Sequence, residues 1–385
     1  MRTIIIVALI QMPALALTPG INQITTTAFA ERSLGAVQSV LALSSLSQPI
    51  AAFGAAMLIN RRLVAKKAVI LFGLFLLAAT GLLAVFFHTK FWHLIILSAS
   101  LGISTGCFVS NMFGLIFDNF NPAERQSIVG YQTSFINIGG IAMSLLGGAL
   151  ATYMWFGGYL VLFVGLPAAV FVIFTVPNYR VPVPEPNGEN TRGRLDPKIY
   201  YYCVIIVLFM ITYTACGSNI STHIAGLGNT ATAGIAVAVT MGGGVFSGFF
   251  FSKLSGKAGD YSMSLALLSV FIGYMMLSVF TSSLVMIFFA VFLVGMSLSI
   301  MLPRCIYMVS TLAVDRSTSS TATALASVVS PSAGSFLSPI VITGLTTALF
   351  GQSTAARYRF VGFIDLALGV FITARTLIWK KKSNA

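Results

Sequence analysis

Arg304 is the residue whose type and surroundings most directly indicate chemistry in this sequence. It follows Pro303 within the long apolar segment 284–310, about two helical turns from the end of that segment. An arginine side chain does not lose its proton when buried, so it needs water, a partner or an anion there. Its planar guanidinium fits a carboxylate, a sulfonate or a phosphate. We therefore expect Arg304 to bind an anionic or strongly polar group; an interfacial position, pairing with backbone carbonyls and a gating contact are the alternatives.

Polar side chains recur at helical spacing in four of the apolar segments. Asparagine and glutamine are costlier to place in hydrocarbon than serine and threonine, which often serve close helix packing. Gln11, Asn111 and Asn219 are therefore the stronger candidates for contact with a polar ligand. The four stripes comprise Gln11, Thr18 and Asn22; Ser100, Ser104, Cys107 and Asn111; Thr212, Cys216, Asn219 and His223; and Ser297, Arg304 and Tyr307.

Ionisable groups that could relay protons are scarce within the apolar segments. Asp365 lies inside the last segment, 360–379, where Arg357 or Arg359 could pair with it. His223 lies at the end of its segment, a position more typical of an interfacial residue. A proton relay needs a titratable group that faces the pathway, so the sequence by itself does not support proton coupling.

No residue pattern indicates catalysis or metal binding. The sequence contains neither HExxH nor GxSxG, and its nine acidic residues are too few to build a catalytic pair within the apolar segments. The four cysteines lie inside apolar stretches without CxxC spacing, which is typical of packing residues rather than of disulfides or zinc ligands. We therefore expect no enzymatic activity, no cofactor and no metal.

The elements that must position these residues are long apolar helices. Hydrophobic residues make up 57% of the 385 residues and charged residues only 8%, with a mean hydropathy of +0.93. A soluble fold carries about 25% charged residues, and a helix of about 20 apolar residues crosses a bilayer. Continuous apolar runs without ten-residue alternation exclude a β-barrel and predict an all-α polytopic membrane protein. Its twelve transmembrane helices are expected at about 3–24, 35–60, 68–88, 92–117, 127–153, 155–177, 199–222, 230–252, 262–281, 284–310, 320–349 and 360–379.

The basic residues indicate how these helices are oriented. With a cytoplasmic N-terminus, 17 of the 22 lysines and arginines fall on the cytoplasmic side, as the positive-inside rule requires. The formal charge of +13 is then an orientation signal, and nucleic acid is not expected as a partner. We expect a multi-pass protein of the cell membrane with both termini in the cytoplasm.

The chain divides into two similar halves. Residues 178–198 are rich in proline, glycine and charge, which predicts a cytoplasmic linker between six helices in 1–177 and six in 199–385. Matching features recur at offsets of 190–193 residues and indicate two pseudo-symmetric six-helix bundles. Glycine and proline at matching positions also favour bends or close helix approach. The matches are Glu124-Arg125 with Asp315-Arg316, Lys66-Lys67 with Gly256-Lys257, Gly102 with Gly295, and Gly139, Gly140, Gly147 and Gly148 with Pro331, Gly334 and Pro339.

These features resemble the major facilitator superfamily over essentially the whole chain. The signature of that family, G-x-x-x-D-[RK]-x-G-[RK]-[RK], follows the second helix of each half. The loop GFFFSKLSGK matches it at Gly248, Lys253 and Lys257 but has Ser252 in place of the acid, and LINRRLVAKK retains only the basic end. The segments ERQSIVG and SFINIGGIAMSLLGGALA are similar to members from Firmicutes-type bacteria that lack an assigned substrate. The resemblance implies cytoplasmic gating loops, with candidate residues Lys66, Lys67, Arg125, Gly248, Lys253, Lys257 and Arg316.

In that family the two halves rock about a central cavity lined by helices one, four, seven and ten, with three, six, nine and twelve as outer scaffold. The resemblance therefore implies a secondary active transporter. Arg304 and the polar stripes favour a small polar or anionic organic solute, whereas the phenylalanine, tyrosine and methionine residues and the sparse charges favour the alternative, efflux of amphipathic drugs. The expected partners are a small-molecule substrate and the lipid bilayer; the coupling ion is left open, and we expect a monomer. The candidate cavity residues are Gln11, Asn22, Ser104, Asn111, Asn219, His223, Ser297, Arg304 and Tyr307.

Overall fold

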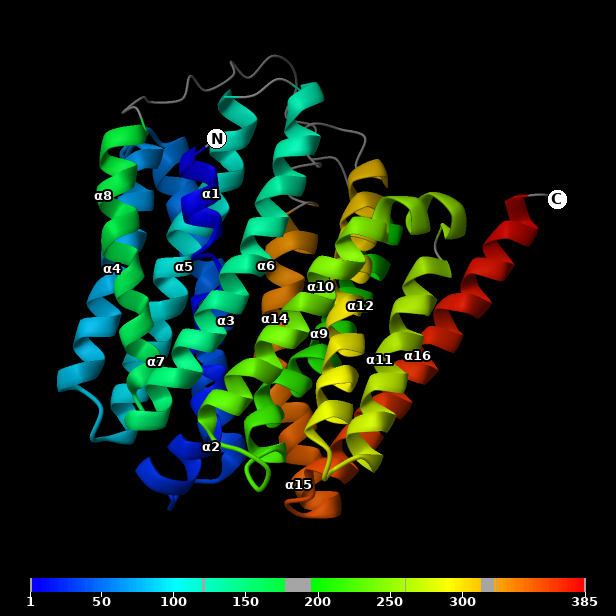
Figure 1. Ribbon diagram of the computed structural model, residues 1–385. Coiled ribbons are helices and arrows are strands. Elements are labelled where there is room, and N and C mark those ends of the chain that lie inside the picture. The colour runs from blue at the N-terminus through cyan, green and yellow to red at the C-terminus, as the bar shows by residue number, and fades with distance from the viewer. Residues whose placement is uncertain are drawn as a thin grey trace. The chain divides into compact units, whose positions relative to one another are not determined.

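The computed structural model describes residues 2–119, 122–176, 195–259, 261–312, 322 and 324–383. Every regular element in this part of the chain is a helix (Figure 1). The chain forms two compact units: unit 1 comprises Met1–Thr191 and Thr230–Ile235, and unit 2 comprises Arg192–Asn229 and Ala236–Ala385. Most of the expected linker, up to residue 194, lies outside the described residues.

Unit 1 contains the first six expected spans. The second to sixth are α3 (Leu34–Asn60), α4 (Lys66–Phe86), α5 (Phe91–Asn119), α6 (Pro122–Tyr153) and a composite of α7 (Gly157–Leu160), the 3-10 helix η4 (Val161–Val164) and α8 (Gly165–Thr175). The first span, expected as one helix over 3–24, is instead broken. It consists of α1 (Arg2–Ala8), the 3-10 helices η1 (Pro13–Ala16) and η2 (Thr18–Gly20), α2 (Ile21–Gln23) and the π-helix η3 (Ile24–Ala28).

Unit 2 contains the other six spans. Continuous helices form five of them: α9 (Pro197–His223), α10 (Thr230–Ala258, whose first residues belong to unit 1), α11 (Tyr261–Val279), α12 (Leu284–Leu312) and α16 (Thr354–Ser383). The eleventh span joins the π-helix η5 (Leu325–Val329), α14 (Ser330–Ser338), the π-helix η6 (Pro339–Gly344) and α15 (Leu345–Phe350). The described residues thus include 11 spans long and apolar enough to cross a membrane, in addition to the broken first span.

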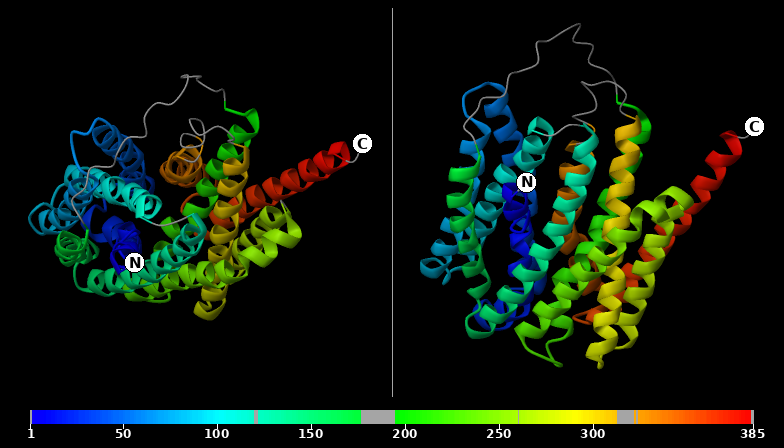
Figure 2. Two further views of the ribbon diagram at one scale, coloured as in Figure 1. Left: turned by 90° about the horizontal axis from the view of Figure 1, so that it is seen from above. Right: turned by 45° about the horizontal axis from the view of Figure 1, so that its top comes forward.

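Helices pair in the same order within each unit. In unit 1, α5 packs against α3 and α4, α4 packs against α8, and α6 packs along the first span. In unit 2, α12 packs against α10 and α11, α11 packs against α16, and α14 packs against α9. The pairing of α11 with α16 is visible in each ribbon view (Figures 1 and 2). Equivalent pairings in both units are what a duplicated six-helix bundle requires.

Matching glycines make the closest of these contacts. Gly102 of α5 faces α3, where a methyl group would overlap the carbonyl of Ser44 and the hydroxyl of Ser47. Gly295 of α12, 193 residues later, faces α10, where a methyl group would overlap the carbonyl of Thr240. Small residues allow membrane helices to approach this closely. The second and fourth helices of each half are therefore held together in the same way.

Apolar side chains both fill and cover each unit. In unit 1, Leu74, Leu101 and Tyr159 are fully buried within one hydrophobic cluster. Large apolar side chains such as Phe72 and Phe174 are exposed on the outside. In a bilayer such an outer surface contacts lipid tails, so polar groups buried inside the units stand out as candidates for function.

Candidate functional site

The first span of unit 1 breaks near its middle. Helix α1 ends at Ala8, and the next backbone bonds, from Ile10 N to Val7 O and from Gln11 N to Ala8 O, are both 3.2 Å and span three residues instead of four. Pro13 has no N–H, so the Leu9 carbonyl loses its helical donor. Irregular backbone at membrane depth is tolerated only where protein or a water-filled cavity covers it. The break therefore marks a place where polar backbone meets a protected interior.

Two of the buried glutamines of unit 1 are Gln11, at this break, and Gln132 of α6, the helix that packs along the broken span. Gln11 is 8% exposed, and its Nε2 has no hydrogen-bond partner among the described residues. Gln132 of α6 is 1% exposed, and within the described part of the chain neither of its amide atoms has a partner. We call these two side-chain amides the open amides. Buried amides without partners are unfavourable by about 1–3 kcal/mol each, and a polar ligand or water that bound them would remove that penalty.

Helix α6 lies directly along the broken span. Its Gly139 packs on the Leu9 carbonyl and its Gly147 on the Ala16 carbonyl, where any larger side chain would overlap the backbone. Both contacts advance in the same direction along the chain, so Gln132, seven residues before Gly139, lies about 10 Å along α6 from the Leu9 contact and is not level with Gln11. Gln132 was not among the predicted site residues, although a glutamine inside the apolar segment 127–153 was a visible signal.

The other predicted polar residues of unit 1 bond mainly within their own helix. Ser104 Oγ donates to the Leu101 carbonyl at 2.8 Å, and Asn111 Nδ2 donates to the Cys107 carbonyl at 2.7 Å. Asn22 lies in α2 and is half-buried. Ser104 and Asn111 are therefore buried in α5, and their hydrogen bonds among the described residues stay within that helix.

In unit 2, the predicted stripe of α9 faces α16. We call these paired residues the α9–α16 polar row. Four residues of α9 pair in order with residues of α16 running in the opposite direction, so the stripe contacts the twelfth span. From the middle of the helices to their ends, the pairs are Thr212 Oγ1 with Asp365 Oδ1 (2.7 Å), the Cys216 carbonyl with Tyr358 OH (3.3 Å), Asn219 Oδ1 with Arg357 Nη1 (2.5 Å) and His223 Nδ1 with Thr354 Oγ1 (2.8 Å).

Arg357 is the largest fully buried side chain described, at 0% exposure. Besides Asn219, its guanidinium donates to Thr346 Oγ1 at 2.9 Å and to Thr347 Oγ1 at 3.0 Å. All three acceptors are neutral. In the described part of the chain the only ion pair joins Glu31 and Arg32, so Arg357 is stabilised there by hydrogen bonds instead of by a carboxylate.

The expected pairing of Asp365 with Arg357 or Arg359 is wrong. Asp365 and Arg357 are eight residues apart on one helix, which separates them by about 12 Å along its axis. Arg359 instead donates from Nε to Ser278 Oγ at 3.0 Å. Asp365 bonds to Thr212 of another helix, a contact that proximity in sequence cannot reveal.

Arg304 lies at the other end of unit 2 from Asn219 and His223. Its Nη2 is 3.9 Å from the position of a Cβ on Gly259, the residue that follows α10 with a φ of +56°. Its guanidinium also lies 5.7 Å from the centroid of the exposed Tyr307 ring. Ser297, two turns earlier, is buried and donates to the Val294 carbonyl at 2.6 Å. The predicted residues of α12 therefore do not join the α9–α16 polar row.

The candidate gating loop of the first half forms one tether. Lys67 Nζ donates to the Ile173 carbonyl at 2.7 Å and so connects the first turn of α4 to the last turn of α8. A cation at the C-terminus of a helix is favoured by the helix dipole. Lys66 also has an interaction partner, and Gly248 is exposed. Arg316 and the side chains of Arg125, Lys253 and Lys257 lie outside the described residues.

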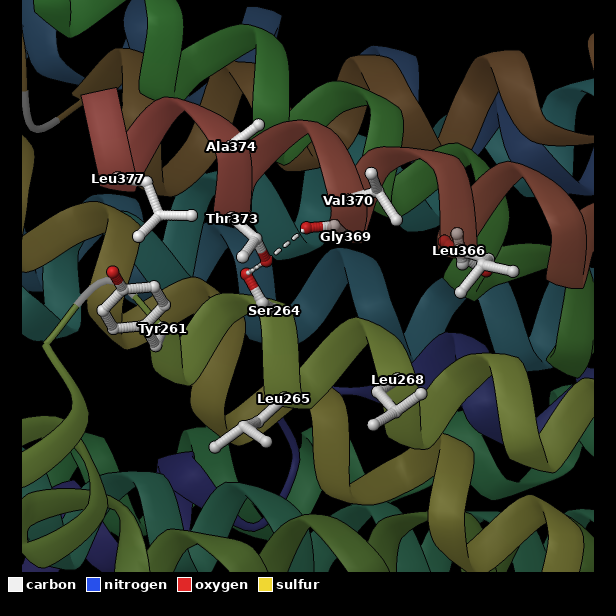
Figure 3. Close-up of a pocket in the computed structure, with 11 residues that line it drawn as sticks. Tyr261, Ser264, Leu265, Leu268, Leu366, Gly369, Val370, Thr373, Ala374 and Leu377 are labelled. Atoms are coloured by element: carbon white, nitrogen blue, oxygen red, sulfur yellow. Dashed lines mark hydrogen bonds between the residues drawn. The ribbon is translucent and has the colours of Figure 1, made fainter. Parts of the chain in front are cut away.

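A groove of about 540 Å³ runs between α11 and α16 of unit 2 (Figure 3). Its walls are mainly leucine, valine and alanine side chains. Ser264 and Thr373 face each other across it and share a hydrogen bond of 2.8 Å. Asp365 contributes to the wall, although its side chain is fully buried. The groove is thus an apolar surface with very few polar groups.

Two repeated six-helix units, with polar groups buried inside apolar helices, define a membrane transport protein. The sequence model of the Major Facilitator Superfamily matches residues 3–339, and the chain belongs to that family. This confirms the resemblance and the all-α fold of two pseudo-symmetric six-helix bundles. No curated protein sequence matches the chain.

Solved structures with this fold include two transporters. A bacterial homolog of the human lysosomal transporter Spinster, in an inward-facing and occupied conformation, matches with a TM-score of 0.72 and 16% identity, over 99% of this chain and 95% of that chain. A mutant of the nucleoside transporter NupG matches with a TM-score of 0.73 and 10% identity, over 98% of each chain. At such low identities the similarity shows the fold alone.

Proposed function

We propose that this protein is a secondary active transporter that moves a small polar or anionic organic solute across the cell membrane by rocker-switch alternating access. The observation that supports it best is the open amide of Gln11 at the break in the first span. Its amide can bond a polar solute, and a discontinuous helix at mid-membrane is a recurrent setting for substrate sites in transporters. The distribution of basic residues supports a cytoplasmic location for both termini.

The charge of the solute is a separate part of the proposal. Arg304 supplies a positive charge near the end of α12, in a chain that carries +13 overall. A permanent guanidinium attracts a carboxylate, a sulfonate or a phosphate in preference to a cation. Arg304 would then favour an anionic solute over a cationic one along the pathway.

Efflux of amphipathic compounds is the second candidate. The groove between α11 and α16 supports it, because an apolar surface with few polar groups fits the body of such a compound. The two proposals predict different substrates. A panel of small organic anions, neutral polar solutes and lipophilic cations, offered to the purified protein in proteoliposomes, separates them. Uptake of lipophilic cations alone would contradict the first proposal.

Gln11→Leu tests the role of the open amide of Gln11. Loss of one neutral hydrogen bond of about 1 kcal/mol weakens solute affinity roughly fivefold. The same change removes a buried amide without a partner among the described residues, so thermal stability should stay equal or rise. The matched control is Gln38→Leu, at a buried glutamine that has an interaction partner; it should lower stability and leave affinity unchanged. Equal affinity in the Gln11 variant and the parent protein would refute the assignment.

A further inference from the structure

Asp365 lies near the middle of a membrane-spanning helix. It is eleven residues from the start of α16 at Thr354, or about 17 Å along the helix axis, in a hydrocarbon layer about 30 Å thick. Its side chain is 0% exposed. An ionisable residue in such a position is rare and generally functional.

The hydrogen bonds around Asp365 favour a carboxylic acid over a carboxylate. Thr212 Oγ1 lies 2.7 Å from Asp365 Oδ1 and 2.8 Å from the Phe209 carbonyl, yet a hydroxyl has a single hydrogen to donate. A carboxylate and the carbonyl would compete for that hydrogen. A carboxylic acid instead donates to Thr212 Oγ1, which leaves the threonine hydrogen for Phe209. Asp365 Oδ2 has no partner in the described part of the chain, a condition far less unfavourable for an acid than for an ion.

The neighbouring groups provide no compensating charge. Tyr274 OH donates to the Thr212 carbonyl at 2.5 Å, so its hydrogen is not directed at Asp365. Arg357, two turns away, is bonded to three neutral side chains. The segments η6 and α15, which also pack on α16, contain no titratable residue. The titratable or charged groups of the surrounding described helices include Tyr213, Cys216 and His223 of α9, Tyr261 and Tyr274 of α11, and Arg357, Tyr358, Arg359 and Arg375 of α16.

We propose that Asp365 is the proton-binding site of this transporter, and this rests on the proposed function as a secondary active transporter. In the state described here the acid is closed off and holds its proton. When unit 2 opens Asp365 to water, the O–H bond breaks, the proton passes to water, and the remaining carboxylate is stabilised by hydration. The site lies in the twelfth span, which the family resemblance assigned to the outer scaffold.

The α9–α16 polar row provides a route to this acid. It begins with His223 and Thr354 at the ends of their helices and continues through Asn219, Arg357 and Tyr358 to Thr212 and Asp365. The remaining nitrogen of His223, Nε2, is buried without a partner among the described residues. These pairs follow one another between the ends of the helices and Asp365, so they mark the most polar way for water and a proton to enter an otherwise apolar unit.

Infrared difference spectroscopy tests the proton site on the purified full-length protein. We expect a carboxylic-acid C=O band at neutral pH that is lost in Asp365→Asn and retained in Asp196→Asn. Asp196 is a suitable control because it caps α9 outside the membrane, where Asn caps equally well. In Thr212→Val the band should shift, because the acid loses its hydrogen-bond partner; this variant decides the assignment if Asp365→Asn does not fold. A band absent from the parent protein at neutral pH, or unchanged in Asp365→Asn and Thr212→Val, would overturn the proposal.

Proton flux in proteoliposomes tests coupling. We expect the parent protein to move protons together with its solute. In Asp365→Asn the rate of proton movement should fall at least tenfold, while solute counterflow is retained. Proton movement that survives at the parental ratio in Asp365→Asn would overturn the role in coupling. If no solute of the panel is transported, the proposed function fails, and the infrared result still decides whether Asp365 holds a proton.

Discussion

Two adjacent glycines of α10 allow the effect of one helix contact to be measured. A Cβ at Gly243 would lie 3.0 Å from the carbonyl carbon of Phe292 and 3.1 Å from the backbone nitrogen of Met296, and closer still to the Phe292 oxygen. All three are backbone atoms of α12 and cannot rotate away. A Cβ at Gly242 would have no described atom within 4 Å. Gly243→Ala therefore adds a steric overlap that Gly242→Ala lacks.

The expected difference in stability follows from these distances. Carbon atoms are most stable about 3.5–4.0 Å apart, so α10 and α12 must separate by roughly 0.5 Å or more to accept the new methyl group. Overpacking of this kind is unfavourable by about 1–3 kcal/mol. Both substitutions also stabilise the helix by about 0.5–1 kcal/mol, because alanine has a higher helix propensity than glycine. That gain cancels in the comparison, so Gly243→Ala should be less stable than Gly242→Ala by about 1–3 kcal/mol.

Thermal unfolding monitored with a thiol-reactive fluorophore is a suitable assay. Three of the four cysteines are buried, and one of them, Cys305, lies in α12 itself. The probe therefore reacts as α12 separates from its neighbours. For a unit of this size each kcal/mol shifts the melting temperature by about 2–4 °C, so the two variants should differ by several degrees.

Each variant can refute the reasoning independently. Equal melting temperatures for Gly243→Ala and Gly242→Ala would show that α10 and α12 do not approach as closely as described. A melting temperature for Gly242→Ala well below that of the parent protein would show that the space beside Gly242 is occupied. Either result would also weaken the equivalence drawn between the two helix pairs of the repeat.

Two further predictions concern buried and half-buried arginines. Asn219→Ala removes an acceptor from the buried Arg357 guanidinium and should lower stability by about 1.5–3 kcal/mol. Asn219→Asp should restore stability, because its carboxylate pairs with the positive charge of Arg357. Equal melting temperatures for these two variants would contradict the assigned bond. Arg304→Ala should lower the affinity for an anionic solute about tenfold or more, with Arg359→Ala as the matched control at an exposed arginine bonded to Ser278. Unchanged saturable uptake and affinity in Arg304→Ala would exclude its role in substrate binding.

The spans could be predicted from the sequence because hydrocarbon thickness imposes one length on every helix. The expected segments agree with 11 described spans to within a few residues at most ends. The first span shows the limit of this approach, because mean hydropathy does not register a missing backbone donor. Pro13 and Pro19 lay within the expected segment 3–24, and both begin or enter 3-10 turns in the structure. A proline-based reading of that segment would have located the break.

The repeat could also be predicted, because a duplicated bundle repeats its closest contacts. Gly102 and Gly295 were matched by offset alone, and each makes the same helix approach in its own unit. In the eleventh span, the π-helices η5 and η6 lie on either side of the segment that begins near Pro331 and ends before Pro339, so the regular α-helix is interrupted there. The matching region of α6 remains a continuous helix, since its glycines provide close packing without removing a backbone donor.

The candidate site was predicted only in part, because periodicity identifies a polar face but not its partner. Thr212, Cys216, Asn219 and His223 do share one face of α9, as their spacing predicts. Their contact with α16 depends on tertiary packing between residues more than 130 positions apart for several pairs. Nothing in the local sequence distinguishes a face that lines a cavity from one that binds a neighbouring helix.

The two buried ionisable residues of α16 illustrate a single physical rule. Arg357 keeps its charge at any depth, so it lies near the start of the helix and is bonded to Asn219, Thr346 and Thr347. Asp365 can be neutralised by a proton, and it lies eight residues deeper with one oxygen lacking a partner in the described structure. A site built for a permanent carboxylate would need several hydrogen-bond donors around it, just as the Arg357 guanidinium has three acceptors around it. The α9–α16 polar row therefore contains one residue with a permanent charge, Arg357, and one residue that a proton can neutralise, Asp365. Only Asp365 lies at a depth where opening to water would change its protonation state.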